Sequence, residues 1–159
     1  MSYILPPEIL DLIIDHLHYE RAMLETCGVV SKSWVPRTRS HPFARVTFDA
    51  PKFGIAWWKK AFLDLSNSPA HHTRTLCVRD LPTPKTTDTD VGGWIHTFCN
   101  VVRLEFLFAG RAALVPFYGL SHTVRALYLT YSTAEVFDLI CSFPLLEDLW
   151  LINLSSKVA

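Results

Sequence analysis

The first strong pattern along the chain is an apolar run near the N-terminus, "LPPEILDLIIDHL", at positions 5–17. At about 100° per residue, its large aliphatic side chains cover an arc of about 200° around a helix axis. These side chains are Ile9, Leu10, Leu12, Ile13, Ile14 and Leu17. The pattern predicts a helix that begins at Pro6 and Pro7, because proline suits the first turn. Docking on the helix's own domain needs a stripe of only about 100°, so the excess indicates burial against a second body, such as another protein.

A second helical pattern follows over residues 20–34, where apolar side chains recur at helical spacing. Its members are Ala22, Met23, Cys27, Val30 and Trp34. Gly28 interrupts the pattern and predicts a break between two short helices. Pro36 and then Pro42 are predicted to stop helical structure. We therefore predict a helical domain over residues 1–42 and a second domain over residues 43–159.

The second domain alternates between short β-type runs and helical runs, and the β-type runs repeat. Each run has two apolar residues separated by one other residue, at Val46/Phe48, Leu76/Val78, Leu104/Phe106, Leu127/Leu129 and Leu149/Leu151. Successive runs start 30, 28, 23 and 22 residues apart. The later spacings fall within the leucine-rich-repeat period of about 20–29 residues, and the earlier ones lie at or just past its upper edge. Three runs also have an apolar residue three positions earlier, at Val101, Val124 and Leu146.

Such a unit is a short strand whose apolar pair points inward, followed by a helical return. One unit cannot bury its own apolar face, so neighbours stack and their strands form a parallel sheet. The segments "GIAWWKKAFLDL", "DVGGWIHTFCNV" and "STAEVFDLICSF" have helical periodicity and the length that a crossover needs. The stretch at positions 82–90 is predicted to be a loop. The alternative is an ordinary α/β domain with coincidental spacing.

Composition and charge narrow the function classes. Half of the 159 residues are apolar, enough for a sizeable core. The 15 basic residues equal the 15 acidic residues, so no net field would attract nucleic acid, an anionic membrane or an acidic substrate. The sequence contains no signal-peptide pattern and no apolar span of about eighteen residues. Four scattered cysteines indicate reduced thiols, and we expect a cytoplasmic or nuclear protein.

Patterns for catalysis and metal binding are weak. Ser121 lies beside His122, but the second glycine of a nucleophile elbow is missing. Three short pairs contain possible zinc ligands: His16/His18, His71/His72 and His96/Cys99. None of them has a second matching pair at zinc spacing. The adjacent carboxylates Glu147 and Asp148 would point to opposite faces of a strand. No phosphate-binding glycine motif occurs. We therefore expect no enzymatic activity, no metal and no cofactor.

One family pattern fits the N-terminal region. The matching residues are Leu5, Pro6, Glu8 and Ile9, then Ile13 and Leu17, then Leu24, Cys27, Val29, Val30 and Ser31, and finally Trp34. Together they resemble an F-box, in particular the F-box-like domains joined to degenerate leucine-rich repeats in fungi. The resemblance implies a small three-helix F-box followed by an irregular α/β solenoid with a parallel sheet. It also implies a non-catalytic substrate receptor of a cullin-RING (SCF-type) ubiquitin ligase, in which the F-box binds a Skp-type adaptor and the repeats bind a target protein.

The resemblance also implies the contact residues. The expected adaptor contacts are Leu5, Pro6, Ile9, Leu10, Ile13, Leu17, Leu24, Val30 and Trp34. Two of these, Leu24 and Val30, could instead pack inside the domain. The alternative function is a repeat scaffold for protein interaction without a ligase, and an unrecognised enzyme is a distant third.

Strand alternation predicts where a target would bind. If the apolar pairs point inward, the residues between and beside them point out of the sheet. These are Thr47, Cys77, Arg79, Glu105, Leu107, Tyr128, Thr130, Trp150 and Ile152. We select Arg79, Glu105, Tyr128 and Trp150 as candidate target contacts, because aromatic and charged residues dominate interface energies. Alternatively, Trp150 and Ile152 could pack under further repeats. Nothing like a polar capping repeat follows Leu151, so we expect the repeat domain to be incomplete there.

Overall fold

The computed structural model divides into two compact units, Met1–Ala44 and Arg45–Ala159. We call them the helical unit and the sheet unit. The structure describes residues 5–49, 55–62, 68–79, 95–107, 115–130 and 136–153. The boundary predicted after Pro42 lies two residues before this division.

The helical unit contains three α-helices: α1 (Pro7–His16), α2 (Arg21–Val30) and α3 (Val35–Ser40). A 3-10 turn, η1 (Lys32–Trp34), leads into α3. The prediction that Pro36 stops helical structure is wrong, because Pro36 lies in the first turn of α3, where proline is tolerated. Helix α1 begins as predicted: Pro6 has extended backbone angles, and its carbonyl accepts the N–H of Leu10 at 3.2 Å. Proline at the first helical position leaves no amide donor unsatisfied there.

The predicted break at Gly28 is wrong, because α2 continues through it. A Cβ atom built at Gly28 would lie 3.2 Å from the Oγ1 of Thr38 on α3. The glycine therefore serves the close approach of two helices. Helix α2 ends instead at Ser31, whose backbone is extended and whose hydroxyl accepts the N–H of Ser33.

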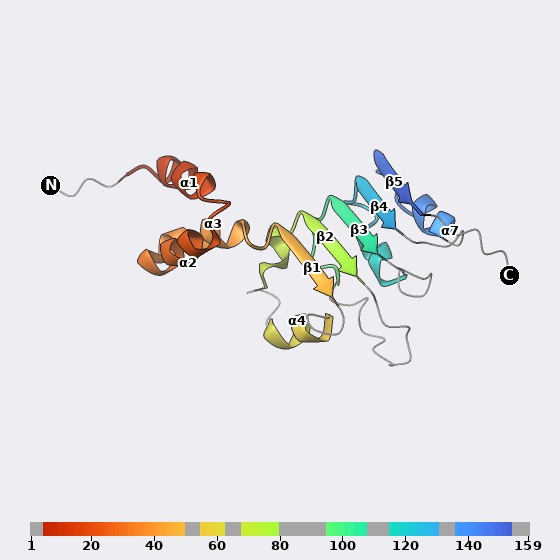
Figure 1. Ribbon diagram of the computed structural model, residues 1–159, viewed down its shortest axis with the longest axis horizontal. Helices are drawn as coiled ribbons and strands as arrows, with labels where there is room; N and C mark the ends of the chain where they lie inside the picture. The colour runs from red at the N-terminus through yellow and green to blue at the C-terminus, as the bar shows by residue number, and fades with distance from the viewer. Residues whose placement is uncertain are drawn as a thin grey trace. The chain divides into compact units, whose positions relative to one another are not determined.

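The sheet unit is built on five parallel strands, which lie side by side in chain order (Figure 1). They are β1 (Arg45–Asp49), β2 (Thr75–Arg79), β3 (Arg103–Leu107), β4 (Ala126–Thr130) and β5 (Asp148–Ile152). Each strand covers one of the predicted β-type runs. Because parallel crossovers are almost always right-handed, a sheet whose strands follow one another in order receives all its crossovers on the same face.

The predicted apolar pairs align in two rows across the sheet. The first row joins Val46, Leu76, Leu104, Leu127 and Leu149, and the second joins Phe48, Val78, Phe106, Leu129 and Leu151. In β1 to β4 every member of both rows is buried. On β5 the burial weakens, and Leu149 is 42% exposed. The prediction that these pairs point to one common face is confirmed for the first four strands.

The backbone hydrogen bonds at the start of the strands repeat as well. The residue just before each of β2, β3 and β4 offers its carbonyl to two N–H groups of the following unit. Arg74 accepts from Val102 and Arg103, at 3.0 Å each. Val102 accepts from Arg125 and Ala126, at 2.8 and 3.0 Å, and Arg125 accepts from Glu147 and Asp148 at the same two distances. The same hydrogen-bonding geometry therefore occurs three times, at three successive steps from one strand to the next.

The connecting segments are less regular than predicted. Two of them contain short helices, α4 (Ile55–Ala61) and α7 (Val136–Cys141). The segment before β2 ends in the 3-10 turn η3 (Pro69–His72), and the segment before β4 contains the 3-10 turn η4 (Val115–Leu120). The predicted loop at 82–90 lies outside the described residues, as do the first five residues of the predicted helical segment at 90–101. After Ile95 that segment forms turns rather than a continuous helix.

The core of the sheet unit lies under the covered face. Three of its aromatic rings meet there: Phe48, Trp58 and Phe98 have centroids 5.4 to 6.0 Å apart. In the part of the chain that the structure describes, no helix has the length and apolar character to cross a membrane.

Candidate functional site

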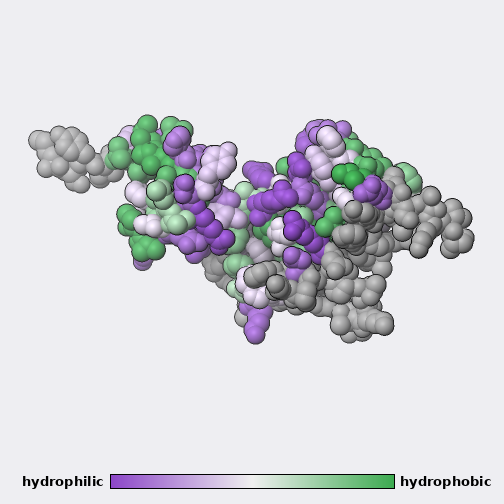
Figure 2. Space-filling view, viewed as in Figure 1, coloured by the Kyte–Doolittle hydropathy of each residue, from purple (hydrophilic) through white to green (hydrophobic). Residues whose placement is uncertain are grey.

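An apolar strip on α1 is the first candidate surface. Its members are Leu12, Ile9 and Ile13, which are 64%, 43% and 48% exposed. At about 100° per residue these side chains span about 100° of the helix circumference, and the buried Ile14 lies about 150° from the centre of the strip. The strip therefore points away from the core of its own unit. Figure 2 shows hydrophobic surface, in green, over α1 and α2.

Helix α2 adds three exposed apolar side chains to the helical unit. They are Met23, Val29 and Val30, at 52%, 88% and 66% exposure. An exposed valine or methionine alone is ordinary, but six exposed large apolar side chains on two short helices are more than is usual away from protein interfaces.

The nine predicted adaptor contacts separate into three groups. The exposed ones are Leu5, Pro6, Ile9, Ile13 and Val30. The partly buried ones are Leu10, Leu17 and Trp34. Leu24 is 2% exposed, so it belongs to the core of the unit and Val30 does not. The exposed Leu12, Met23 and Val29 were not among the predicted contacts, although the width of the predicted arc already included Leu12.

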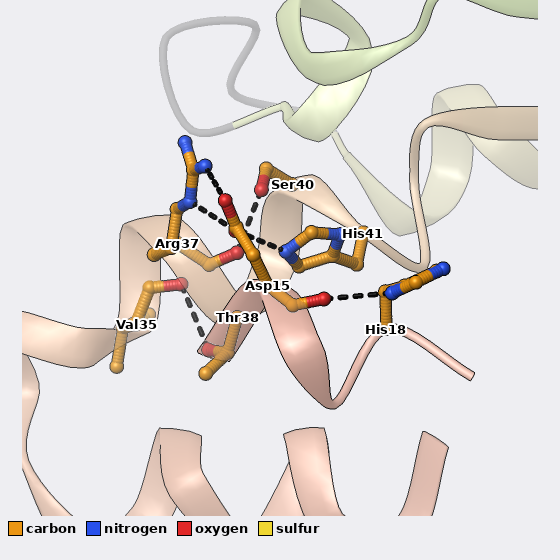
Figure 3. Close-up of polar contacts among 7 residues, drawn as sticks. All are labelled: Asp15, His18, Val35, Arg37, Thr38, Ser40 and His41. Atoms are coloured by element: carbon orange, nitrogen blue, oxygen red, sulfur yellow. Dashed lines mark hydrogen bonds and ion pairs between the residues drawn. The ribbon is translucent and has the colours of Figure 1, made fainter. Parts of the chain in front are cut away.

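A polar cluster holds α1 against α3 (Figure 3). Arg37 donates two hydrogen bonds to the carboxylate of Asp15, one of them from Nε at 2.6 Å. The Nε2 of His41 lies 2.9 Å from the same carboxylate. His18 donates from Nδ1 to the backbone carbonyl of Asp15 at 2.7 Å. We call Asp15, Arg37 and His41 the clasp.

The clasp compensates an unfavourable charge position. Asp15 lies in the last turn of α1, where the helix dipole disfavours a negative charge. The hydrogen bond from Arg37, with a smaller contribution from His41, holds the pKa of Asp15 below its usual value of 3.8, although partial burial opposes this. The same bond raises the pKa of Arg37. The sequence pattern did not indicate the clasp, since its members are 22 and 26 positions apart.

The second candidate surface is the face of the sheet opposite the core, which we call the open face. Glu105 is its electrostatic centre: one carboxylate oxygen accepts from Arg45 at 2.6 Å and the other from Arg103 at 2.7 Å. The guanidinium carbon of Arg103 lies 3.8 Å from the ring centroid of Tyr128. Tyr128 in turn stacks on Trp150, with centroids 5.4 Å apart and planes within 6°. Side chains from β1, β3, β4 and β5 are thus linked in one continuous row.

A pocket of about 270 Å³ opens on this face beside the row. Its lining includes Arg45, Arg79, Arg103, Tyr128 and Thr130. Figure 2 shows hydrophilic surface, in purple, over the first strands of the sheet. Parallel sheets are usually covered on both faces, so a polar and partly exposed second face indicates a binding surface.

All four predicted target contacts belong to this face, but in different states. Arg79 and Trp150 are exposed, Tyr128 is partly buried, and the Glu105 side chain is only 15% exposed. The outward-pointing Cys77 is buried, at 5% exposure. Arg45 and Arg103 were not among the predicted contacts, although extending the same alternation by one step from Thr47 and Glu105 would have included both.

Other chemistry finds little support. Within the described ranges, no group of three or more histidine, cysteine, aspartate or glutamate side chains could hold a metal ion. Ser121 is buried and its neighbour His122 is exposed. Comparisons with protein-family models, curated proteins and solved structures found no match to this chain. The function must therefore be argued from the two surfaces.

Proposed function

We propose that the chain is a non-catalytic adaptor of the F-box type. Its helical unit docks on the Skp-type adaptor of a cullin-RING ubiquitin ligase, and its sheet unit, as a degenerate leucine-rich-repeat solenoid, binds a target protein. The single observation that carries this proposal is the exposed strip of Leu12, Ile9 and Ile13, which the helical unit's own core does not use.

Energetics favours a protein as the cover for this strip. Fully burying an aliphatic side chain contributes about 1.5–3 kcal/mol, and the strip residues are already about half buried, so each can add roughly half of that. Together they can anchor an interface. The strip is apolar and lies on a helix, which suits docking into the groove of another helical protein. The F-box resemblance of the same residues makes a Skp-type adaptor the first partner to test.

The repeated backbone entry supports the solenoid half of the proposal. A leucine-rich repeat places one short strand and one return segment in each unit, with strands in chain order and in register. The carbonyls of Arg74, Val102 and Arg125 repeat one hydrogen-bonding geometry at intervals of 28 and 23 residues. Return segments of differing length and type are compatible with a degenerate repeat.

The test is co-purification of the full chain with a Skp-type adaptor, followed by a binding measurement on the complex. We expect a stable complex. Ile13→Asp should weaken it by about 100-fold or more, because docking would desolvate an unpaired charge. Trp34→Ala should weaken it through the loss of a large anchoring side chain.

Ile13→Val is the matched control, since it keeps an apolar side chain at the same position, and we expect less than about a fivefold change. Circular dichroism should show both Ile13 variants folded, because this side chain is half exposed. If the wild-type chain does not bind the adaptor, the ligase role is wrong, and a repeat scaffold without ligase association becomes the better explanation.

A further inference from the structure

We infer that the open face of the sheet unit binds an acidic segment of a partner protein. A carboxylate of that segment lies between Arg79 and Arg103, and an apolar or aromatic neighbour lies against the Tyr128–Trp150 stack. This inference rests on the target-binding half of the proposed function and names the chemistry of the target.

Among the described residues that line the pocket, Glu105 is the one carboxylate. Both of its oxygens already accept a charge-assisted hydrogen bond, from Arg45 on β1 and from Arg103 on the same strand. The side chain is also mostly buried. Glu105 is therefore a positioning residue that fixes two arginines, and it is a poor contact for a basic target.

The arginines retain unused donors. A guanidinium has five N–H groups, and Arg103 uses its Nε–H for Glu105. Its position on the Tyr128 ring fixes the plane of the guanidinium, which reduces the entropy lost when it binds a planar carboxylate. Arg79 is exposed and, among the residues that the structure describes, has no ion-pair partner within 4 Å.

The charge of the pocket favours an anionic group. Its lining contains three arginines against the single carboxylate of Glu105. Asp49 is the neighbour of Arg79 in the β1–β2 register, and counting it still leaves an excess of positive charge. The chain as a whole is neutral, and Asp148, on the same face of β5, does not line the pocket, so this excess is local to the pocket. An acidic group is thus attracted to this site without a general affinity of the protein for polyanions.

The shape of the site favours a protein segment over a small molecule. A volume of about 270 Å³ lies at the lower end of the range of about 300–1,000 Å³ that small-molecule sites occupy, and it suits a single side chain. Next to the pocket, Trp150 and Ile152 are 53% and 48% exposed, and with the Tyr128 ring they form an apolar shelf. A segment that places one carboxylate in the pocket can therefore rest its neighbouring side chain on the shelf.

The experiment is a titration of the full chain with blocked hexapeptides, followed by two-dimensional NMR of the backbone amides. The first peptide is acetyl-Ser-Gly-Glu-Phe-Gly-Ser-amide. In three others Glu is replaced by Gln or Lys, or Phe by Ala. We expect the Glu–Phe peptide to bind with a dissociation constant on the order of 1 mM, with shifts centred on β2 to β5. The Gln and Lys peptides should bind at least about fivefold more weakly, and the Ala peptide about threefold more weakly.

Variants test the arginines directly. Arg79→Gln should weaken the Glu–Phe peptide about five- to tenfold and leave the Gln peptide unchanged. Because Arg79 is exposed, the melting temperature should not move. Arg74→Gln is the matched control, since Arg74 is exposed, lies just before the same strand and does not line the pocket. It should change nothing.

Several outcomes would overturn the inference. They are equal binding of the Glu, Gln and Lys peptides, an Arg79→Gln variant that binds like the wild type, and no saturable binding at all. Preference for a phosphoserine peptide or a short oligonucleotide over the Glu peptide would assign the face to a different ligand class. Adaptor binding is measured on the same samples, so a failure here with an intact adaptor complex rejects this inference and leaves the docking half of the proposed function standing.

Discussion

The two units of this chain use apolar residues in opposite ways. Among the described residues, the helical unit buries two large apolar side chains, Ile14 and Leu24, and exposes a strip and several neighbours. The sheet unit buries two complete rows across four strands, together with a cluster of aromatic rings beneath them. Apolar content alone therefore does not indicate stability, because what matters is how much of it the unit covers itself.

The difference changes what holds each unit together. Dense burial makes the sheet unit depend on packing, whose loss is costly and insensitive to pH and salt. The helical unit has a small core, so the clasp between Asp15 and Arg37 carries a larger share of its stability. A unit of this kind gains further stability when a partner covers its apolar strip.

The largest expected effect is the loss of a core aromatic from the sheet unit. Phe98 is fully buried and lies within 6.0 Å of the Phe48 and Trp58 ring centroids. Phe98→Ala should reduce the free energy of unfolding of this unit by about 3–5 kcal/mol. Amide hydrogen exchange should show lost protection in β1 to β3 and unchanged protection in α1 to α3.

Phe137→Ala is the control for this prediction, because Phe137 on α7 is 52% exposed. We expect it to cost less than about 1 kcal/mol. Equal loss of protection in both units after Phe98→Ala would mean that they unfold together, and the comparison between them would fail.

The next effect concerns the clasp. Asp15→Asn removes the charge that accepts both Arg37 hydrogen bonds, and should destabilise the helical unit by about 1–2 kcal/mol. The expected loss is modest because solvent screens the pair: the Asp15 and Arg37 side chains are 34% and 42% exposed. Exchange rates of α1 and α3 amides measure the loss. Glu25→Gln breaks an exposed Arg21 pair on α2 and should cost less than about 0.5 kcal/mol.

The clasp also gives the two units different responses to acid. The folded-state pKa of Asp15 is lowered, so its stabilisation is fully present above the unfolded value of 3.8 and is lost as the pH falls through the folded value. The helical unit of the wild type should therefore loosen below about pH 4, while Asp15→Asn removes this component. NMR of the Trp34 indole N–H and of the α3 amides would follow the change. An unchanged acid transition in the variant would contradict this role of the clasp.

Local patterns explain which features could be predicted from the sequence. The apolar pair in each β-type run determined both the strand positions and their register, because every pair must reach the same core. The wide arc on the first helix likewise predicted exposure of Ile9 and Ile13. These features depend on side chains within a few positions of one another.

Features that depend on distant residues were missed. The continuation of α2 through Gly28 depends on how closely α3 approaches, and the clasp joins Asp15 to a helix 22 positions away. On the open face, the position of Glu105 depends on Arg45, which is 60 positions earlier. No periodicity within one segment encodes such partners. Strand alternation therefore placed the four candidate contacts on one face of the sheet but did not include Arg45 and Arg103.

The smallest effect compares two buried threonines, one in each unit. Thr73 is fully buried in the position that Val101 and Val124 occupy in the next repeats. Among the described residues its hydroxyl has no hydrogen-bond partner. Thr38 is also buried, but its hydroxyl donates to the Val35 carbonyl at 3.1 Å. An unsatisfied buried hydroxyl costs about 1–3 kcal/mol, whereas a satisfied one contributes about 0.5–1.5 kcal/mol.

Substitution by valine should therefore have opposite signs at the two positions. Thr73→Val should stabilise the sheet unit by about 1 kcal/mol, because a methyl group replaces the unsatisfied hydroxyl. The equivalent position in the next two repeats is already a valine, Val101 or Val124. Thr38→Val should destabilise the helical unit by about 0.5–1 kcal/mol, since it removes a satisfied donor where Gly28 leaves little room. Denaturant unfolding with separate probes for each unit measures both. A loss of stability in Thr73→Val would mean that this hydroxyl is bonded, for example to water, and that the sheet core is less dry than its packing indicates.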